Sequence, residues 1–208
     1  RHSFPTRRSS DLISFSEAVA HLDTSDFTVS GTTATVSQLT SVGGNAYDIT
    51  ISGGNLASLD ATVTLDFAAA QNITDSAGNA LTVTAASATS QRTYLVDNTP
   101  PALNAAGSSP ADNATNIAVN SALTLKFAEA LDANSDLTKV YLKDAVTDTL
   151  VPATITLSGS GDLVITPTGS LAYSTAYYVT WDANALKDAA GNAAENIGPH
   201  NGGARIDA

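Results

Sequence analysis

The sequence repeats itself with a period of about 110 residues. The segment Phe15-Ser16-Glu17-Ala18-Val19 returns as Phe127-Ala128-Glu129-Ala130-Leu131, and Asp75-Ser76-Ala77-Gly78-Asn79 returns as Asp188-Ala189-Ala190-Gly191-Asn192. A third segment, Val96-Asp97-Asn98, is echoed by Ile206-Asp207-Ala208. Landmarks that recur in the same order at one spacing indicate tandem domains of similar length. The chain is therefore expected to be an array of domains rather than one large fold.

The first twelve residues do not fit this repeat. Back-translated, residues 2–12 resemble a common short-read sequencing adapter, so we interpret residues 1–12 as an artefact and exclude them from the fold. This removes Arg1, Arg7, Arg8 and Asp11, so the 9 basic and 20 acidic residues become 6 and 19, a net charge of −13. Only two residues then precede Phe15, whereas a long stretch separates the proline pair from Phe127. The first domain is predicted to lack its first strand or strands.

Short apolar runs that alternate with polar residues dominate both copies, and helical periodicity is almost absent. Gly, Asn, Asp and Ser separate the runs, as in turns. The predicted strands cover residues 27–29, 47–51, 61–67, 123–127, 140–142, 153–157, 163–165 and 177–181. Short strands with frequent turns in domains of this size predict an all-β fold class, with two tandem antiparallel β-sandwiches.

The segment Asp97-Asn98-Thr99-Pro100-Pro101 marks the predicted domain boundary. Proline cannot donate a backbone hydrogen bond to a sheet, and it holds the residue before it in an extended conformation. We expect a truncated sandwich over residues 13–97, a short and stiff proline-rich linker over residues 98–101, and a second sandwich over residues 102–207.

Composition excludes several classes of function. The chain has no cysteine, which rules out disulfides and thiolate metal sites. Its negative charge disfavours binding to nucleic acid and to anionic membranes, whereas it suits divalent cations. No apolar run is long enough for a membrane span, and no nucleophile elbow or phosphate-binding glycine loop is found. We expect a protein that is not an enzyme.

The second copy resembles the bacterial Ig-like module known from S-layer proteins. The resemblance rests on the segments 109–120, 123–131, 171–180 and 188–192, which occur in that order. The first copy resembles the related Ig-like repeats of large bacterial adhesins through the segments 15–19, 25–29, 75–79 and 97–101. This resemblance implies two tandem Ig-like antiparallel β-sandwiches that belong to a secreted or cell-surface multidomain bacterial protein.

The repeated acidic residues carry the sharpest prediction. In an Ig-like sandwich, the end of the second strand and the loop before the last strand lie at the pole where the linker enters. We therefore predict a calcium site at the domain junction, because carboxylate and amide oxygens are the ligands that Ca²⁺ prefers. Its predicted ligands are Asp97, Asn98, Glu129, Asp132 and Asp188, and the equivalent site of the first domain would use Glu17 and Asp75. The alternative is that Asp75 and Asp188 only cap tight turns.

The aromatic residues allow two interpretations. Tyr177 resembles the tyrosine corner of Ig-like domains, with Val179 and Trp181 on the inner face of the same strand. Alternatively, Tyr173, Tyr178 and Trp181 would form a platform for an aromatic-stacked ligand. A weak carbohydrate-binding surface would use Tyr141, Tyr173 and Tyr178.

We expect a structural or adhesive repeat module of a large extracellular bacterial protein, secreted or held at the cell surface. It would act as a semi-rigid spacer, with Ca²⁺ as its one candidate cofactor. Its expected partners are neighbouring repeats and host or biofilm glycans or proteins, with no nucleic acid and no membrane insertion. The alternative is an accessory linker or weak carbohydrate-binding module of a secreted polysaccharide-degrading enzyme.

Overall fold

The computed structural model describes residues 11–82, 92–196 and 205–207. The chain divides into two compact units between Asn98 and Thr99, a point that falls within the predicted linker. Both units consist of antiparallel strands, so the predicted all-β fold class is confirmed. Within the described ranges, helical structure is limited to three 3₁₀ turns, η1 (Thr24–Asp26), η2 (Leu56–Ser58) and η3 (Leu137–Lys139), and none of these could cross a membrane.

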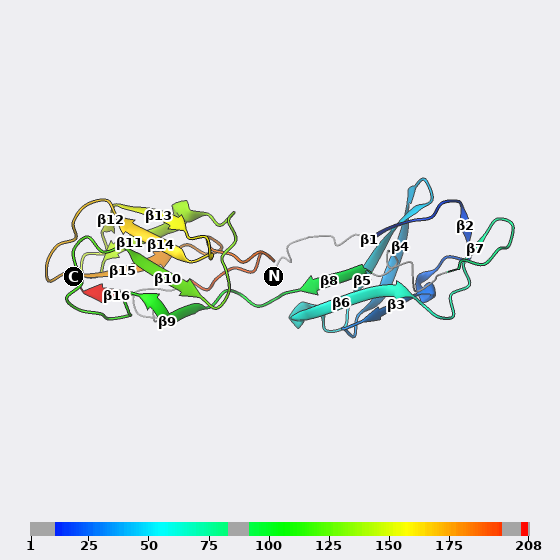
Figure 1. Cartoon of the computed structure of the whole chain (residues 1–208), viewed down its shortest axis with the longest axis horizontal. Coiled ribbons are helices and arrows are strands. Elements are labelled where there is room, and N and C mark those ends of the chain that lie inside the picture. Colours follow the sequence, from blue (N-terminus) through cyan, green and yellow to red (C-terminus); the bar gives the residue numbers. More distant parts are fainter. Residues whose placement is uncertain (1–10, 83–91, 197–204, 208) are drawn as a thin grey trace. The chain divides into compact units, whose positions relative to one another are not determined.

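The second unit is a sandwich of two four-stranded sheets (Figure 1). Its strands are β9 (Leu103–Ser109), β10 (Leu123–Phe127), β11 (Val140–Asp144), β12 (Leu150–Val151), β13 (Ala153–Leu157), β14 (Leu163–Pro167), β15 (Ala176–Trp181) and β16 (Arg205–Asp207). One sheet has the order β13-β14-β10-β9 and the other has the order β12-β11-β15-β16. This division of successive strands between two sheets is the Ig-like arrangement, with one additional short strand, β12.

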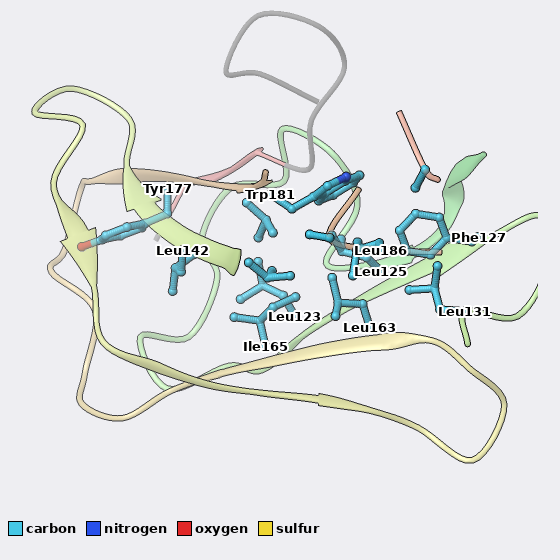
Figure 2. Close-up of a cluster of buried hydrophobic side chains, with 14 of the residues drawn as sticks. Leu123, Leu125, Phe127, Leu131, Leu142, Leu163, Ile165, Tyr177, Trp181 and Leu186 are labelled. Carbon is cyan, nitrogen blue, oxygen red and sulfur yellow. The ribbon is translucent and has the colours of Figure 1, made fainter. Parts of the chain in front are cut away.

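Alternating residues of the two inner faces form the core of the second unit. Leu123, Leu125 and Phe127 alternate along β10, and all three are buried. Trp181 is 1% exposed and packs against Phe127, with ring centroids 5.8 Å apart. Figure 2 shows Tyr177 at one end of the labelled cluster and Phe127 at the other. The core therefore extends along the length of the strands, as expected for a sandwich.

Tyr177 closes the loop that precedes β15. Its side chain is 4% exposed, and its hydroxyl oxygen accepts a hydrogen bond from the backbone N–H of Ala172 at 2.8 Å. A tyrosine at the start of this strand that bonds to the backbone a few residues upstream is the tyrosine corner predicted from the sequence. Val179 and Trp181 lie on the inner face with Tyr177, also as predicted.

The first unit contains two three-stranded sheets and a small two-stranded one. Its strands are β1 (Asp11–Ser14), β2 (Val19–Ala20), β3 (Phe27–Ser30), β4 (Thr35–Gly43), β5 (Ala46–Ser52), β6 (Ala61–Phe67), β7 (Thr74–Asp75) and β8 (Arg92–Val96). The three sheets have the orders β1-β5-β4, β3-β6-β8 and β2-β7. Figure 1 shows β3, β6 and β8 side by side. A smaller core of Phe27, Ile49 and Leu65 lies between the two larger sheets.

The repeat in the sequence corresponds to a repeat in the fold. The sheets β1-β5-β4 and β3-β6-β8 match β10-β14-β13 and β11-β15-β16 strand for strand and in the same order along the chain. Within the described residues, β10 has two neighbouring strands, β14 and β9, whereas β1 has β5. β1 begins at Asp11, inside the segment interpreted as an artefact, and residues 1–10 lie outside the described residues.

Candidate functional site

Asp188 organises the loop that follows β15. Its Oδ1 accepts hydrogen bonds from the backbone N–H groups of Gly191 at 2.6 Å and Asn192 at 2.8 Å, and its Oδ2 accepts from Asn192 Nδ2 at 2.8 Å. Gly191 has a φ of +96°, a conformation that glycine adopts at little cost. Asp188 is 3% exposed, so a buried carboxylate holds the loop closed from within. The turn role predicted for Asp188 is present in the structure.

Asp75 makes the same loop in the first unit. Its Oδ1 accepts from the N–H groups of Ala77 and Asn79, both at 2.8 Å, and its Oδ2 accepts from Asn79 Nδ2 at 2.7 Å. These bonds, led by the one from the Asn79 side chain, lower the pKa of Asp75 below its ordinary value. The repeated Asp-x-Ala-Gly-Asn motif therefore encodes one loop geometry twice.

Glu129 lies close to Asp188 in the second unit. It follows the end of β10 by two residues and is partly buried. Carboxylate oxygens of Glu129 and Asp188 come within 4.8 Å of each other. The structure thus brings together two of the predicted ligands, from two loops that are far apart in the sequence.

Asp132 has a different environment. Its backbone N–H donates to the carbonyl of Lys187 at 2.7 Å, which places it beside the residue before Asp188. Its Oδ1, however, accepts from both the backbone N–H and the side-chain Nδ2 of Asn134, at 2.7 and 2.8 Å. Within the described residues, Asp132 is not part of the acidic group that could hold an ion. It acts as a turn-forming residue beside that group.

Asp97 and Asn98 are the last residues of the first unit. Asn98 donates from its backbone N–H to Oδ1 of Asp60 at 2.5 Å. Its Nδ2 donates to the carbonyls of Leu56 and Leu59, at 3.0 and 2.7 Å. The amide nitrogen of Asn98 therefore fastens the end of the first unit to the η2 turn. The role of Asp97 and Asn98 as metal ligands stays a prediction.

Glu17 and Asp75, the predicted ligands of the equivalent site in the first unit, lie near each other in the fold. Val19 pairs with Asp75 between β2 and β7, and Glu17 lies two residues before Val19. Glu17 is exposed. In the part of the chain that is described, these two residues belong to no group of three potential metal ligands, and their role as ligands also stays a prediction.

The predicted aromatic platform is wrong, because two of its three members are buried. Trp181 lies in the core and Tyr178 is only 4% exposed, whereas Tyr173 is 83% exposed. Tyr141 is half-buried and donates from its hydroxyl to Oδ2 of Asp182 at 3.1 Å. The described residues of the second unit therefore present Tyr173 alone of these side chains as a freely exposed ring, and a single ring offers no row for stacking sugars.

Sequence reasoning did not single out the environment of Tyr178. Its hydroxyl donates to Oδ1 of Asp148, and the same carboxylate receives Nζ of Lys143 at 3.2 Å. Burial, followed by the hydrogen bond to Asp148, raises the pKa of Tyr178 to about 12. The bonds from Tyr178 and Lys143 lower the pKa of Asp148. Lys143 and Asp148 lie five residues apart in one hairpin, whereas Tyr178 lies 30 residues from Asp148, so no local motif identifies the three together.

A comparison with known protein families agrees with the two-sheet fold of the second unit. Residues 97–198 match the family described as bacterial Ig-like domain. No curated protein matches the chain.

Two solved structures of bacterial surface-layer proteins are similar to about half of the chain. The N-terminal part of the bacterial S-layer protein SbsC is 18% identical over 52% of this chain and 23% of that chain, with a TM-score of 0.38. Domains 1–6 of the surface layer protein SbsC are 17% identical over 52% of this chain and 13% of that chain, again with a TM-score of 0.38. The chain thus spans less than a quarter of the length of either. With the two-sheet topology and the tyrosine corner of the second unit, the family match identifies residues 97–198 as a bacterial Ig-like domain.

Proposed function

We propose that this chain is a structural segment of a large extracellular bacterial surface protein. In this role, successive Ig-like domains act as a semi-rigid spacer that carries other parts of the protein away from the cell. The proposal is supported by the bacterial Ig-like family of residues 97–198 and by the internal repeat. The S-layer context of the similar solved structures agrees with it.

We also propose that calcium stiffens the junction between domains. The observation that carries this proposal is the pair of carboxylates on Glu129 and Asp188, with oxygens no more than 4.8 Å apart. Two oxygens that each lie about 2.3–2.6 Å from one Ca²⁺ ion can be separated by up to about 5 Å. The pair therefore fits two ligands of one ion, and the ion would remove the repulsion between the two negative charges.

A third carboxylate would come from Asp97. Asn192, which is bonded to Asp188, also donates from Nδ2 to the carbonyl of Thr99 at 3.4 Å. Asp97 precedes Thr99 by two residues, a stretch of chain that reaches at most about 7 Å. Asp97, Glu129 and Asp188 are therefore proposed as the group that holds the ion. An ion bound in this way would link the last strand of one domain to loops of the next.

Thermal unfolding of the full chain in excess Ca²⁺ and in chelator tests the calcium proposal. The single tryptophan, Trp181, reports on the second unit alone, because it is buried in the core of that unit. Calcium at 100 times its Kd stabilises the native state by about 2.7 kcal/mol, which corresponds to a rise in Tm of roughly 10 °C or more for a domain of this size.

Matched variants show which carboxylate the calcium-dependent rise in Tm requires. Glu129→Gln should abolish the calcium-dependent rise in Tm, whereas Glu195→Gln, which makes the same chemical change at an exposed position, should leave it intact. Equal melting temperatures of the unmodified chain in calcium and in chelator would remove the calcium proposal. The spacer role would then rest on the domains and the proline linker alone.

A further inference from the structure

The first unit has an edge strand of unusual length and composition. β4 (Thr35–Gly43) has nine residues and lies at the end of the sheet β1-β5-β4, with β5 as its neighbouring strand among the described residues. An edge strand presents unpaired backbone N–H and C=O groups, which can pair with another strand. Natural edge strands are commonly protected by charged residues, by proline or by β-bulges. β4 has two bulges but contains no charged residue and no proline.

The absence of charge extends well beyond β4. Residues 27–47 contain no Asp, Glu, Lys, Arg or His, in a chain with a net charge of −11. The nearest carboxylate on this sheet is Asp48, which pairs with Thr40 and therefore lies one strand in from the edge. If two β4 strands paired, the two Asp48 positions would be three strand spacings apart, about 14 Å, which exceeds the screening length of about 8–10 Å in physiological salt. Two copies of this acidic protein can therefore meet at β4 without close contact between like charges.

Four other edge strands of the described sheets are less suited to pairing. β12 has only two residues, and β3 has four. β13, the counterpart of β4 in the second unit, has five residues and directly follows Pro152. β9 lies between Pro101 and Pro110. Of these strands, β4 therefore offers the longest run that is free of both charge and proline.

Two bulges define which part of β4 can pair. The register with β5 shifts between Val36 and Gln38 and again between Ser41 and Gly43. A bulge bends a strand and interrupts its pairing. The four residues Gln38–Ser41 between the bulges keep a continuous register, so this segment is the candidate pairing surface.

We propose that β4 is a self-association edge, through which a second copy of this chain adds its own β4 in an antiparallel register. The joined sheet would have the order β1-β5-β4-β4-β5-β1. Its contacts would be main-chain hydrogen bonds over Gln38–Ser41, with Thr and Gln side chains beside them. A pairing of four residues is weak for a single domain, but several such edges in one protein would act together.

Sedimentation of the full chain over a wide concentration range tests this proposal. The expected result is a concentration-dependent monomer–dimer equilibrium that strengthens as salt screens the net charge. Gln38→Lys places a charge on the pairing segment opposite the uncharged Thr50 and should weaken dimerisation by at least about tenfold. The control is Thr62→Lys, which adds the same charge at an exposed position of β6, a central strand.

The outcomes are distinct once circular dichroism has shown that both variants are folded. Loss of dimer in Gln38→Lys but not in Thr62→Lys supports the proposal. A monomer at every concentration overturns it. A dimer that both variants retain equally also overturns it, since the association then uses another surface.

Discussion

Asn192 donates a hydrogen bond from Nδ2 to Oδ2 of Asp188 at 2.8 Å, and Asn79 makes the same bond to Asp75 at 2.7 Å. In both units the aspartate accepts the backbone N–H of this asparagine through its other oxygen. The first and last residues of each motif thus bond to each other directly, which fixes the shape of the loop. In the second unit this loop also presents Asp188 to Glu129.

Asp188→Ala is expected to destabilise the second unit by about 2–4 kcal/mol. The substitution leaves the N–H groups of Gly191 and Asn192 without their charged acceptor in a partly buried loop. Denaturant unfolding followed by the fluorescence of Trp181 measures the change. Asp188→Asn keeps one oxygen acceptor and should cost less than the alanine variant. Equal stability of Asp188→Ala and the unmodified chain would show that the carboxylate does not hold the loop.

Tyr177→Phe is expected to lower the stability of the second unit by about 1 kcal/mol. The ring keeps its place in the core, but the N–H of Ala172 loses the hydroxyl oxygen that accepts its hydrogen bond. Tyr173→Phe is the control, because Tyr173 is 83% exposed, and it should change stability by less than about 0.5 kcal/mol. If the two variants unfolded at the same denaturant concentration, the tyrosine corner would have no energetic role.

Leu125→Ala should cost about 2–5 kcal/mol, because Leu125 is 0% exposed and its truncation leaves a cavity in the core. Leu150→Ala removes the same atoms from a residue that is 64% exposed and should cost less than about 0.5 kcal/mol. Thermal or denaturant unfolding of both variants provides the comparison. Similar losses at the two positions would contradict the placement of the core.

Stability of the second unit should fall as the pH rises from about 10 to about 12. The folded state raises the pKa of Tyr178 to about 12, whereas an unfolded tyrosine ionises near its ordinary value of about 10. Its contribution to stability is therefore complete below about pH 10 and is lost as the pH approaches 12.

Unfolding of the unmodified chain and of Tyr178→Phe between pH 9 and 12 checks this expectation. The variant should show a weaker pH dependence, while Tyr173→Phe should behave as the unmodified chain does. The same slope in all three proteins would contradict the raised pKa of Tyr178.

The regular parts of the fold could be predicted from the sequence because burial on one face imposes a period of two. Each of the eight predicted strands corresponds to a strand of the structure, from β3 to β15. β4 was not predicted, and its bulges explain why. Val36 and Leu39 both pack on the core although they are three residues apart, because the extra residue Ser37 shifts the pattern. In a segment with this spacing, apolar and polar residues do not alternate, so the sequence pattern does not predict a strand.

The candidate site could be predicted only in part. The motif at Asp188 was visible because its loop is local in sequence, and Ig-like topology brings Glu129 to the same end of the domain. The turn role of Asp132 depends on Asn134, which competes for the same oxygen atom. The alternation along β15 places Tyr178 on the outer face of the strand, which predicts an exposed side chain. Tyr178 is buried there because Asp148 and Lys143, from another strand and its turn, contact it.

The proposed stiffening of the domain junction by calcium is tested most directly by a distance measured between the two units. The chain has no cysteine, so Thr62→Cys and Thr154→Cys together give one spin label on an exposed position of each unit. Pulsed electron paramagnetic resonance then measures the distribution of distances between the labels in calcium and in chelator. If calcium stiffens the junction, the distribution is clearly narrower in calcium, and this narrowing is absent when Glu129→Gln is added. Distributions of equal width in calcium and in chelator would contradict it.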